Sequence, residues 1–387
     1  MIKVLVLGGS GIVGRAVVKD LAEQSDVSQI VIGDLNVAKA KNFVAQLKNR
    51  KVSVRSIDVS DYAKLVQTMK EFDVIGNCVY YGSLLEITRA AIEAKVHVAD
   101  LGGMFHMTKK QMKLDGPAKK AGITVLSSCG SGPGLNNVLA RYGADELDQV
   151  DEIHIRAGGV APSPGSPPRK GAGMTIRTVL DEFAMNPIVF ENGDYKEVPP
   201  LSGKEMVKFI DPIGEQPAYF SLHTEPLTLG KYIKGVKKVT LKVIFPDKEI
   251  ERINPLLEMG LTSTNPIKWG GKKVSPRQLI DHILATREQQ EKEQGREICG
   301  TILWVTGLKS GVSTKLTFEY WVEHDKRWGN TKTGVPMAVG LLMLGRGQIT
   351  DKGFAPPEKA IDPLAFIGEL KKRGFVFKRT EESNSRL

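Results

Sequence analysis

The chain has 387 residues, 41% apolar and 25% charged, which is typical of a folded protein with room for two cored domains. No stretch approaches the roughly 18 consecutive apolar residues of a membrane span, and the net charge of +10 comes from Lys and Arg scattered among acidic residues, so neither a membrane nor a nucleic-acid partner is expected. The chain has three cysteines and no CxxC pair, which argues against a disulfide framework and a zinc site. Its apolar start runs into glycines without a cleavage site, so no signal peptide is expected. We therefore expect a cytoplasmic protein without a metal.

The first 130 residues alternate between short apolar strands and amphipathic helices. Such alternation is typical of right-handed crossovers and a parallel sheet covered on both faces. Residues 1–130 are therefore predicted to form an α/β domain of the Rossmann type. The expected strands are Lys3–Leu7, Gln29–Gly33, Val52–Ile57, Val74–Val79, Val96–Leu101 and Ile123–Ser127, and the expected helices are Val13–Glu23, Val37–Asn49, Tyr62–Lys70, Leu84–Ala94 and Lys109–Ala121.

The pattern changes after residue 130 and predicts a second, α+β domain over residues 131–331. The clearest strand is Ser313–Glu323, where apolar and polar residues alternate with a period of two, as in a sheet with unlike faces. Strands are also expected over Asp151–Arg156, Val236–Phe245 and Glu297–Thr306, helices over Thr175–Met185 and from Ser275-Pro276 to Glu293, and a Pro/Gly/Ser-rich loop over Val160–Lys170.

The C-terminal segment, residues 332–387, returns to a helical pattern from Thr333 onward. We expect it to pack back on the first domain. Its last residues, Lys378–Leu387, are predicted to form a frayed tail.

The segment Gly9-Ser10-Gly11-Ile12-Val13-Gly14 is a GxGxxG motif between the first expected strand and the first expected helix. This context makes the motif specific, because glycine lets the backbone approach a pyrophosphate and the helix N-terminus then faces the anion. The motif predicts a dinucleotide site that includes all six residues.

Asp34 ends the second strand, 20 residues after Gly14, where a carboxylate accepts hydrogen bonds from ribose hydroxyls and repels a 2′-phosphate. NAD is therefore favoured over NADP. Asp58, after the third strand, is a candidate for adenine contact, and Asn77, after the fourth, for the path to the nicotinamide. Both also fit ordinary turn residues at strand ends.

The chain resembles the saccharopine dehydrogenase (reductase-type) family, and within it the lysine 6-dehydrogenase-like members. Besides the glycine loop, the resemblance rests on several short motifs in a fixed order. They are Asp100-Leu101-Gly102-Gly103, Gly130–Asn137 with its Pro-Gly turn, Gly158–Pro162, Leu180-Asp181-Glu182, His223-Thr224 and Thr333–Pro336. The resemblance implies a second domain with a mixed sheet that binds substrate and forms a homodimer.

Two positions depart from the family's pattern. Gly132 stands where many members have Asp before Pro-Gly, which argues against saccharopine as the substrate. Glu225-Pro226 replaces the Ser-Gly that follows His-Thr in lysine 6-dehydrogenase-like members, which leaves lysine itself open as the substrate.

Oxidation of an amine by NAD needs a positioned C–H bond and a base for the amine proton. His223 is the first candidate for acid–base work, Asp181 for binding a substrate ammonium, and Tyr80 for a wall of the nicotinamide pocket. A structural histidine, a solvated helix charge and plain aromatic packing are the corresponding alternatives.

The leading hypothesis is a lysine 6-dehydrogenase-like, NAD-dependent oxidation at a C–N bond of an amino acid or amine. The alternatives are an imine reductase of the saccharopine or carboxynorspermidine type, which usually uses NADPH, and a non-catalytic sensor of nicotinamide redox state.

Overall fold

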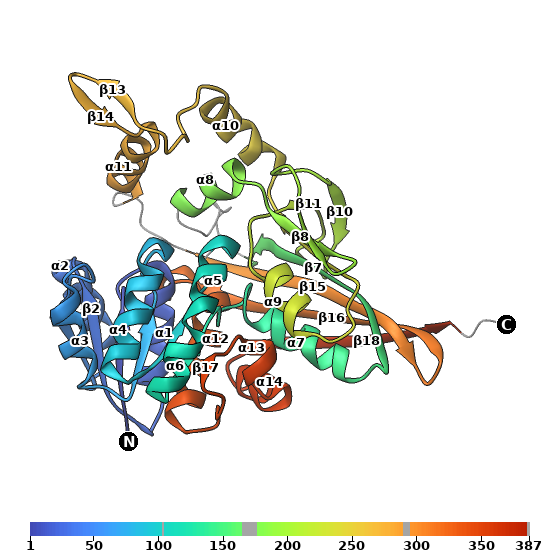
Figure 1. The fold of residues 1–387 in the computed structure, drawn as a ribbon, viewed down its shortest axis with the longest axis horizontal. Helices are drawn as coiled ribbons and strands as arrows, with labels where there is room; N and C mark the ends of the chain where they lie inside the picture. Colours follow the sequence, from blue (N-terminus) through green and yellow to red (C-terminus); the bar gives the residue numbers. More distant parts are fainter. Residues whose placement is uncertain (103, 165–175, 289–294, 385–387) are drawn as a thin grey trace.

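The computed structural model describes residues 1–102, 104–164, 176–288 and 295–384. Two sheets lie side by side, with the first in the N-terminal part and the second in the middle of the chain (Figure 1). Among the described residues, no helix combines the length and apolar character needed to cross a lipid bilayer.

The first sheet is parallel and has the strand order β17-β6-β5-β4-β1-β2-β3. Its apolar strands are buried because helices cover both faces. The strands are β1 (Ile2–Leu7), β2 (Val27–Asp34), β3 (Val52–Ser56), β4 (Val74–Asn77), β5 (His97–Asp100), β6 (Thr124–Leu126) and β17 (Gly353–Phe354). The helices are α1 (Ile12–Ala22), α2 (Val37–Leu47), α3 (Tyr62–Met69), α4 (Leu84–Ala94), α5 (Phe105–Gln111) and α6 (Asp115–Ala121), with single 3₁₀ turns η1 (Tyr81–Ser83) and η2 (Met112–Leu114). The predicted parallel α/β architecture is confirmed.

The helix expected over Lys109–Ala121 is wrong in detail, because α5, η2 and α6 replace it. Pro117 explains the break. Proline has no N–H and would clash with the preceding turn inside a longer helix, whereas in the first turn of α6 it costs no hydrogen bond.

The second sheet is mixed, as predicted, and has the main strand order β10-β11-β12-β7-β15-β16-β18. Strands β12 and β7 are parallel, and the other neighbours in this path are antiparallel. The strands are β7 (Gln149–Pro162), β8 (Ile188–Glu191), β9 (Asp194–Glu197), β10 (Glu205–Lys208), β11 (Glu215–Phe220), β12 (Lys238–Ile244), β15 (Arg296–Lys309), β16 (Val312–Asp325) and β18 (Val376–Asn384). The remaining elements are α7 (Leu135–Asp145), α8 (Ile176–Ala184), α9 (Glu225–Tyr232), α10 (Asp247–Glu258), the hairpin β13 (Ile267–Trp269) and β14 (Lys272–Val274), α11 (Pro276–Glu288) and η3 (Lys326–Trp328).

Two expectations for this sheet are wrong. The loop predicted from Val160 begins later, because β7 pairs with β15 up to Pro162 across a bulge at Gly158; part of that loop lies outside the described residues. The tail predicted over Lys378–Leu387 is part of strand β18 as far as Asn384, and β18 pairs with the edge of β16; residues 385–387 lie outside the described residues. The expected helix end at Glu293 also falls outside the described residues.

Three helices follow near the C-terminus: α12 (Thr331–Gly345), α13 (Pro357–Ala360) and α14 (Pro363–Lys371). Helix α12 packs on α1 and on β4 and β5 of the first sheet, whereas α13 and α14 pack on α7. The approach is close at Gly334, where a Cβ atom would lie only 2.6 Å from the Cβ of Ala16 and 2.8 Å from the carbonyl oxygen of Val13. Any larger residue there would push the two helices apart. Since α12 also packs on β4 and β5, it lies beside α1 on the same face of the first sheet and fixes the position of α1 there.

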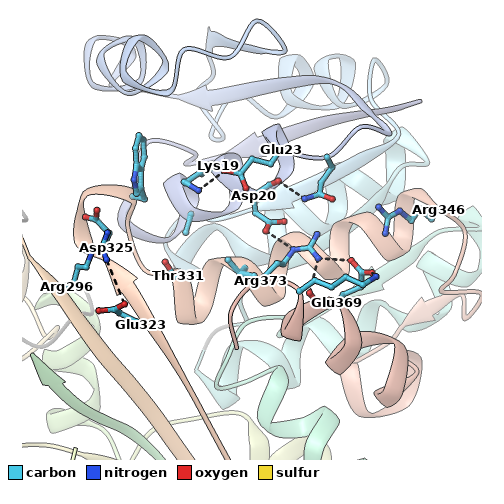
Figure 2. A pocket seen from close by; sticks show the side chains of 15 residues that line it. Lys19, Asp20, Glu23, Arg296, Glu323, Asp325, Thr331, Arg346, Glu369 and Arg373 are labelled. Carbon is cyan, nitrogen blue, oxygen red and sulfur yellow. Dashed lines mark hydrogen bonds and ion pairs between the residues drawn. The ribbon is translucent and has the colours of Figure 1, made fainter. Parts of the chain in front are cut away.

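A buried ion pair reinforces this contact. Figure 2 shows Arg373, just after α14, between Asp20 of α1 and Glu369. Arg373 Nε lies 2.7 Å from Asp20 Oδ2, and the two side chains are only 10% and 7% exposed. Burial raises the pKa of Asp20 more than Arg373 lowers it, so the carboxylate depends on its partner to remain charged.

Replacing Arg373 with Leu should lower the free energy of unfolding by ~3–5 kcal/mol, because it leaves the Asp20 charge buried without its partner. Urea unfolding measures the loss. The Asp20→Leu/Arg373→Leu double variant should recover part of it, while Lys372→Leu at the neighbouring exposed position should change little. Equal losses for R373L and K372L would contradict a buried pair.

Candidate active site

The glycine loop joins β1 to α1 and is shaped by close backbone contacts. At Gly14 a Cβ atom would lie 2.3 Å from the carbonyl oxygen of Gly8 and 2.7 Å from the Cα of Gly9, so only glycine fits. The N-terminus of α1 at Ile12 and Val13 follows, with Gly11 as its N-cap. The first-turn N–H groups of a helix have no partner within it, so Gly9–Gly14 would hold a pyrophosphate.

Asp34, at the end of β2, lies against this loop. Its Oδ2 accepts a hydrogen bond from Ser10 Oγ at 2.6 Å and from Ser10 N at 3.3 Å, and its Oδ1 accepts from Asn36 N at 3.0 Å. The structure thus brings together the predicted loop and the predicted ribose ligand. The contacts hold the carboxylate at the mouth of the loop, where an adenosine ribose would reach it.

The other two predicted cofactor residues make local contacts. Asp58 is exposed beyond the end of β3, and its Oδ1 accepts from Ser60 N at 2.9 Å and Ser60 Oγ at 2.7 Å, which stabilises the turn before α3. Asn77 is the buried last residue of β4, and its Oδ1 accepts from Val79 N at 3.0 Å. Both side chains lie at the carboxyl edge of the sheet, the edge at which ligands bind in such folds.

Asp181 of α8 reaches across to the first domain. Its Oδ2 accepts hydrogen bonds from the hydroxyls of Tyr81 and of Tyr80, the latter at 3.2 Å, and its Oδ1 pairs with Arg277 Nη1 at 2.8 Å. Arg277 Nε also contacts Asp281 at 2.8 Å. Burial raises the pKa of the Tyr81 hydroxyl, and the bond to Asp181 adds to the rise. The predicted pair Tyr80 and Asp181 therefore share one buried polar cluster at the carboxyl end of β4.

His223 lies between two buried carboxylates. Its Nε2 is 3.2 Å from Glu182 Oε1, and its Nδ1 is 3.2 Å from Glu225 Oε2. Both ring nitrogens can donate only when the imidazole is doubly protonated. Burial alone would lower the pKa of His223, but Glu225 and Glu182 outweigh it and hold the pKa well above its ordinary value. The two carboxylates therefore stabilise the imidazolium form of His223.

Several further contacts keep these carboxylates in place. Glu182 accepts hydrogen bonds from Ser221 Oγ and from Leu222 N, the latter at 2.9 Å. Glu225 accepts from Asn136 Nδ2 at 3.0 Å. A Cβ atom on Gly132 would lie 2.6 Å from that Asn136 nitrogen and 3.1 Å from Glu225 Oε1, so the glycine that departs from the family pattern leaves room for the pair.

Asp181 and Glu182 are adjacent on α8. The cluster of Asp181 with Tyr80, Tyr81 and Arg277 therefore neighbours the cluster of His223 with Glu182 and Glu225. Together they hold the carboxylates of Asp181, Glu182, Glu225 and Asp281 against the cations Arg277 and His223, an excess of two negative charges when all are ionised. Such a surplus would favour a cationic group nearby, and an imidazolium is chemically able to donate a proton. In the described ranges, no group of three or more His, Cys, Asp or Glu side chains is arranged to hold a metal ion.

Five members of these clusters were not predicted as site residues: Tyr81, Glu182, Glu225, Arg277 and Asp281. Tyr81 was adjacent to a candidate, and Glu225 follows the His-Thr pair by one residue. Arg277 carried no signal, because its partner Asp181 is 96 positions away in the chain.

The charge on His223 makes a pH-dependent contribution to stability. Because its folded pKa is raised, the contribution is complete below the unfolded pKa of about 6.5 and is lost as the pH rises through the folded pKa. The stability advantage of the wild type over His223→Gln should therefore be largest near pH 6 and shrink toward alkaline pH. Chemical unfolding at several pH values measures this, and a pH-independent difference would contradict a charged His223.

Comparison with known proteins accounts for nearly the whole chain. Residues 4–126 match the family model described as the saccharopine dehydrogenase NADP binding domain, and residues 130–375 match the saccharopine dehydrogenase C-terminal domain. Carboxyaminopropylagmatine dehydrogenase of Synechocystis is 26% identical over 97% of this chain and 96% of its own length, and carboxynorspermidine synthase of Vibrio cholerae is 25% identical over 95% and 94%.

Among solved structures, apo saccharopine dehydrogenase (L-Glu forming) from Saccharomyces cerevisiae has the same fold. Its TM-score is 0.72, with 18% identity, over 98% of this chain and 100% of that one. With both family models matched in order along the chain, this protein is an enzyme of the saccharopine dehydrogenase family, whose members are oxidoreductases that act on amine C–N bonds.

Proposed function

We propose that the protein is an NAD-dependent oxidoreductase that acts on a C–N bond of a small amino acid or amine. The observation that carries the proposal is the placement of Asp34 on the glycine loop together with the surplus of buried carboxylates at the junction of the two domains. The glycine loop with Asp34 would suit a dinucleotide, and the surplus of carboxylates would suit a cationic amine.

NAD, when bound, would supply the hydride acceptor for the substrate carbon. In the oxidative direction, the substrate ammonium must first lose a proton to solvent, so that the lone pair on its nitrogen can expel the hydride. Asp181 is proposed to bind the ammonium, while His223, held charged by Glu182 and Glu225, is proposed to orient the substrate and return a proton to the leaving nitrogen after water has added to the imine. Tyr80 is proposed to form a wall of the pocket.

The names of the two full-length relatives favour a secondary amine that joins an amino acid to a second amine. The lysine 6-dehydrogenase-like reaction is the second candidate. Asp34 favours it, because oxidation by NAD does not require the 2′-phosphate that this carboxylate would repel. The family model's description mentions NADP, so both cofactors belong in the assay.

An absorbance assay for NADH separates these possibilities. NAD or NADP is offered with lysine, other diamino acids, polyamines and N-carboxyalkyl amines, and the reduced cofactors are offered with aldehyde and amine pairs. We expect turnover with NAD on at least one compound that contains both an amine and a carboxylate. Absence of turnover in both directions across the panel would contradict the proposed function.

The cofactor preference can be tested at Asp34. Replacing Asp34 with Asn keeps one oxygen that can accept from Ser10 but removes the negative charge. NAD should therefore bind about tenfold more weakly, and the preference for NAD over NADP should become smaller. Fluorescence titration with NADH and NADPH measures both effects, with Asp194→Asn at an exposed hairpin as the matched control. Unchanged NADH affinity in D34N would remove Asp34 from the site.

The homodimer predicted from the family resemblance is part of the proposal. Sedimentation equilibrium of the purified chain distinguishes it from a monomer.

A further inference from the structure

A cavity lies between α5 of the first domain and the end of α8, beside the cluster of Asp181 with Tyr80, Tyr81 and Arg277 (the Asp181 cluster). Its volume is about 620 Å³. Figure 1 shows α5 and α8 facing one another at the junction of the two domains. His106, Lys109, Lys110 and Lys113 line one wall.

This cavity is strongly cationic on the α5 side. The three lysines follow His106 at spacings of three, four and seven residues, which places them on one side of the helix and the turn after it. All three are exposed, and none forms an ion pair within the described parts of the chain. The opposite wall contributes one carboxylate, Glu197, which accepts a hydrogen bond from Asn186 Nδ2 at 3.2 Å. The cavity therefore has a surplus of positive charge that is free to meet an anion.

His106 connects this cavity with the Asp181 cluster. Its ring packs edge-on against Tyr81 with 6.2 Å between ring centroids, and the Tyr81 hydroxyl donates to Asp181. His106 Nδ1 is buried and has no hydrogen-bond partner among the described residues. Burial and Lys110 lower the pKa of His106, while Asp181 acts in the opposite direction, so the ring lies within reach of both charges.

We propose that this cavity, defined by His106, Lys109, Lys110 and Lys113, binds the carboxylate of the substrate while the Asp181 cluster receives its amine. The inference rests on the proposed function and adds the direction in which the substrate lies. The negative charge of the Asp181 cluster and the positive charge of the cavity match a molecule with an amine at one end and a carboxylate at the other. A simple polyamine has no carboxylate, so it would bind without this contribution.

The test compares two ligands that differ only in the distal charge. The probes are 5-aminovalerate and its neutral amide, 5-aminovaleramide, titrated by calorimetry with NADH present so that no oxidation occurs. The variant is Lys109→Gln/Lys110→Gln/Lys113→Gln. The control is Lys64→Gln/Lys70→Gln/Lys120→Gln, which removes the same net charge at exposed positions outside the cavity.

Wild type and control should bind 5-aminovalerate about tenfold tighter than the amide, and the cavity variant should bind both alike. Added salt should weaken the preference, because the lysines are exposed. Failure of the wild type to prefer the carboxylate, or an undiminished preference in the cavity variant, would overturn the proposal.

These outcomes are separable from failure of the proposed function, because binding requires no turnover. If the panel of amines gives no NADH but the lysines still control the preference for 5-aminovalerate, only the reaction is wrong. If a substrate is oxidised and its KM is the same in wild type and cavity variant, only the carboxylate site is wrong; the proposal predicts a raised KM with a smaller change in kcat.

Discussion

The burial of three carboxylates, Asp181, Glu182 and Glu225, is the constraint on which the rest of the site depends. A charge removed from water is costly unless an opposite charge or several hydrogen bonds meet it. Here the partners come from separate parts of the chain: Tyr80 and Tyr81 follow β4, Arg277 lies on α11, His223 precedes α9 and Asn136 lies on α7. Satisfying the carboxylates therefore requires both domains to be in place, and this couples folding to the assembly of the site.

Helix α1 has a comparable double role. The N-terminus of α1 continues the glycine loop. The helix itself contacts α12 at Gly334 and is paired with Arg373 through Asp20. The dinucleotide loop is therefore held by segments from both ends of the chain.

Much of the fold could be predicted from the sequence, because its signals are local. Apolar strands with intervening helices define the first domain, and the period of two over Ser313–Glu323 indicates the second sheet. The same holds for Asp34, whose spacing from Gly14 follows from one βαβ unit. The strand character of residues after Lys378 could not be predicted, since it comes from pairing with the distant edge of β16.

In the candidate site, too, the local signals could be predicted from the sequence and the contacts between distant residues could not. His223 and Asp181 could be named from short motifs, but their environment could not, because Glu182, Arg277 and Tyr81 meet them only after folding. The shifted pKa of His223 is a tertiary property of this kind, produced by two carboxylates that approach opposite sides of one ring.

A crystal structure of the chain with NAD bound tests the account most directly. We expect the adenosine ribose to form hydrogen bonds with Asp34, the pyrophosphate to lie on Gly9–Gly14 and the nicotinamide to face Tyr80 and Asp181. A ribose away from Asp34, or a nicotinamide turned away from the carboxylate cluster, would contradict it.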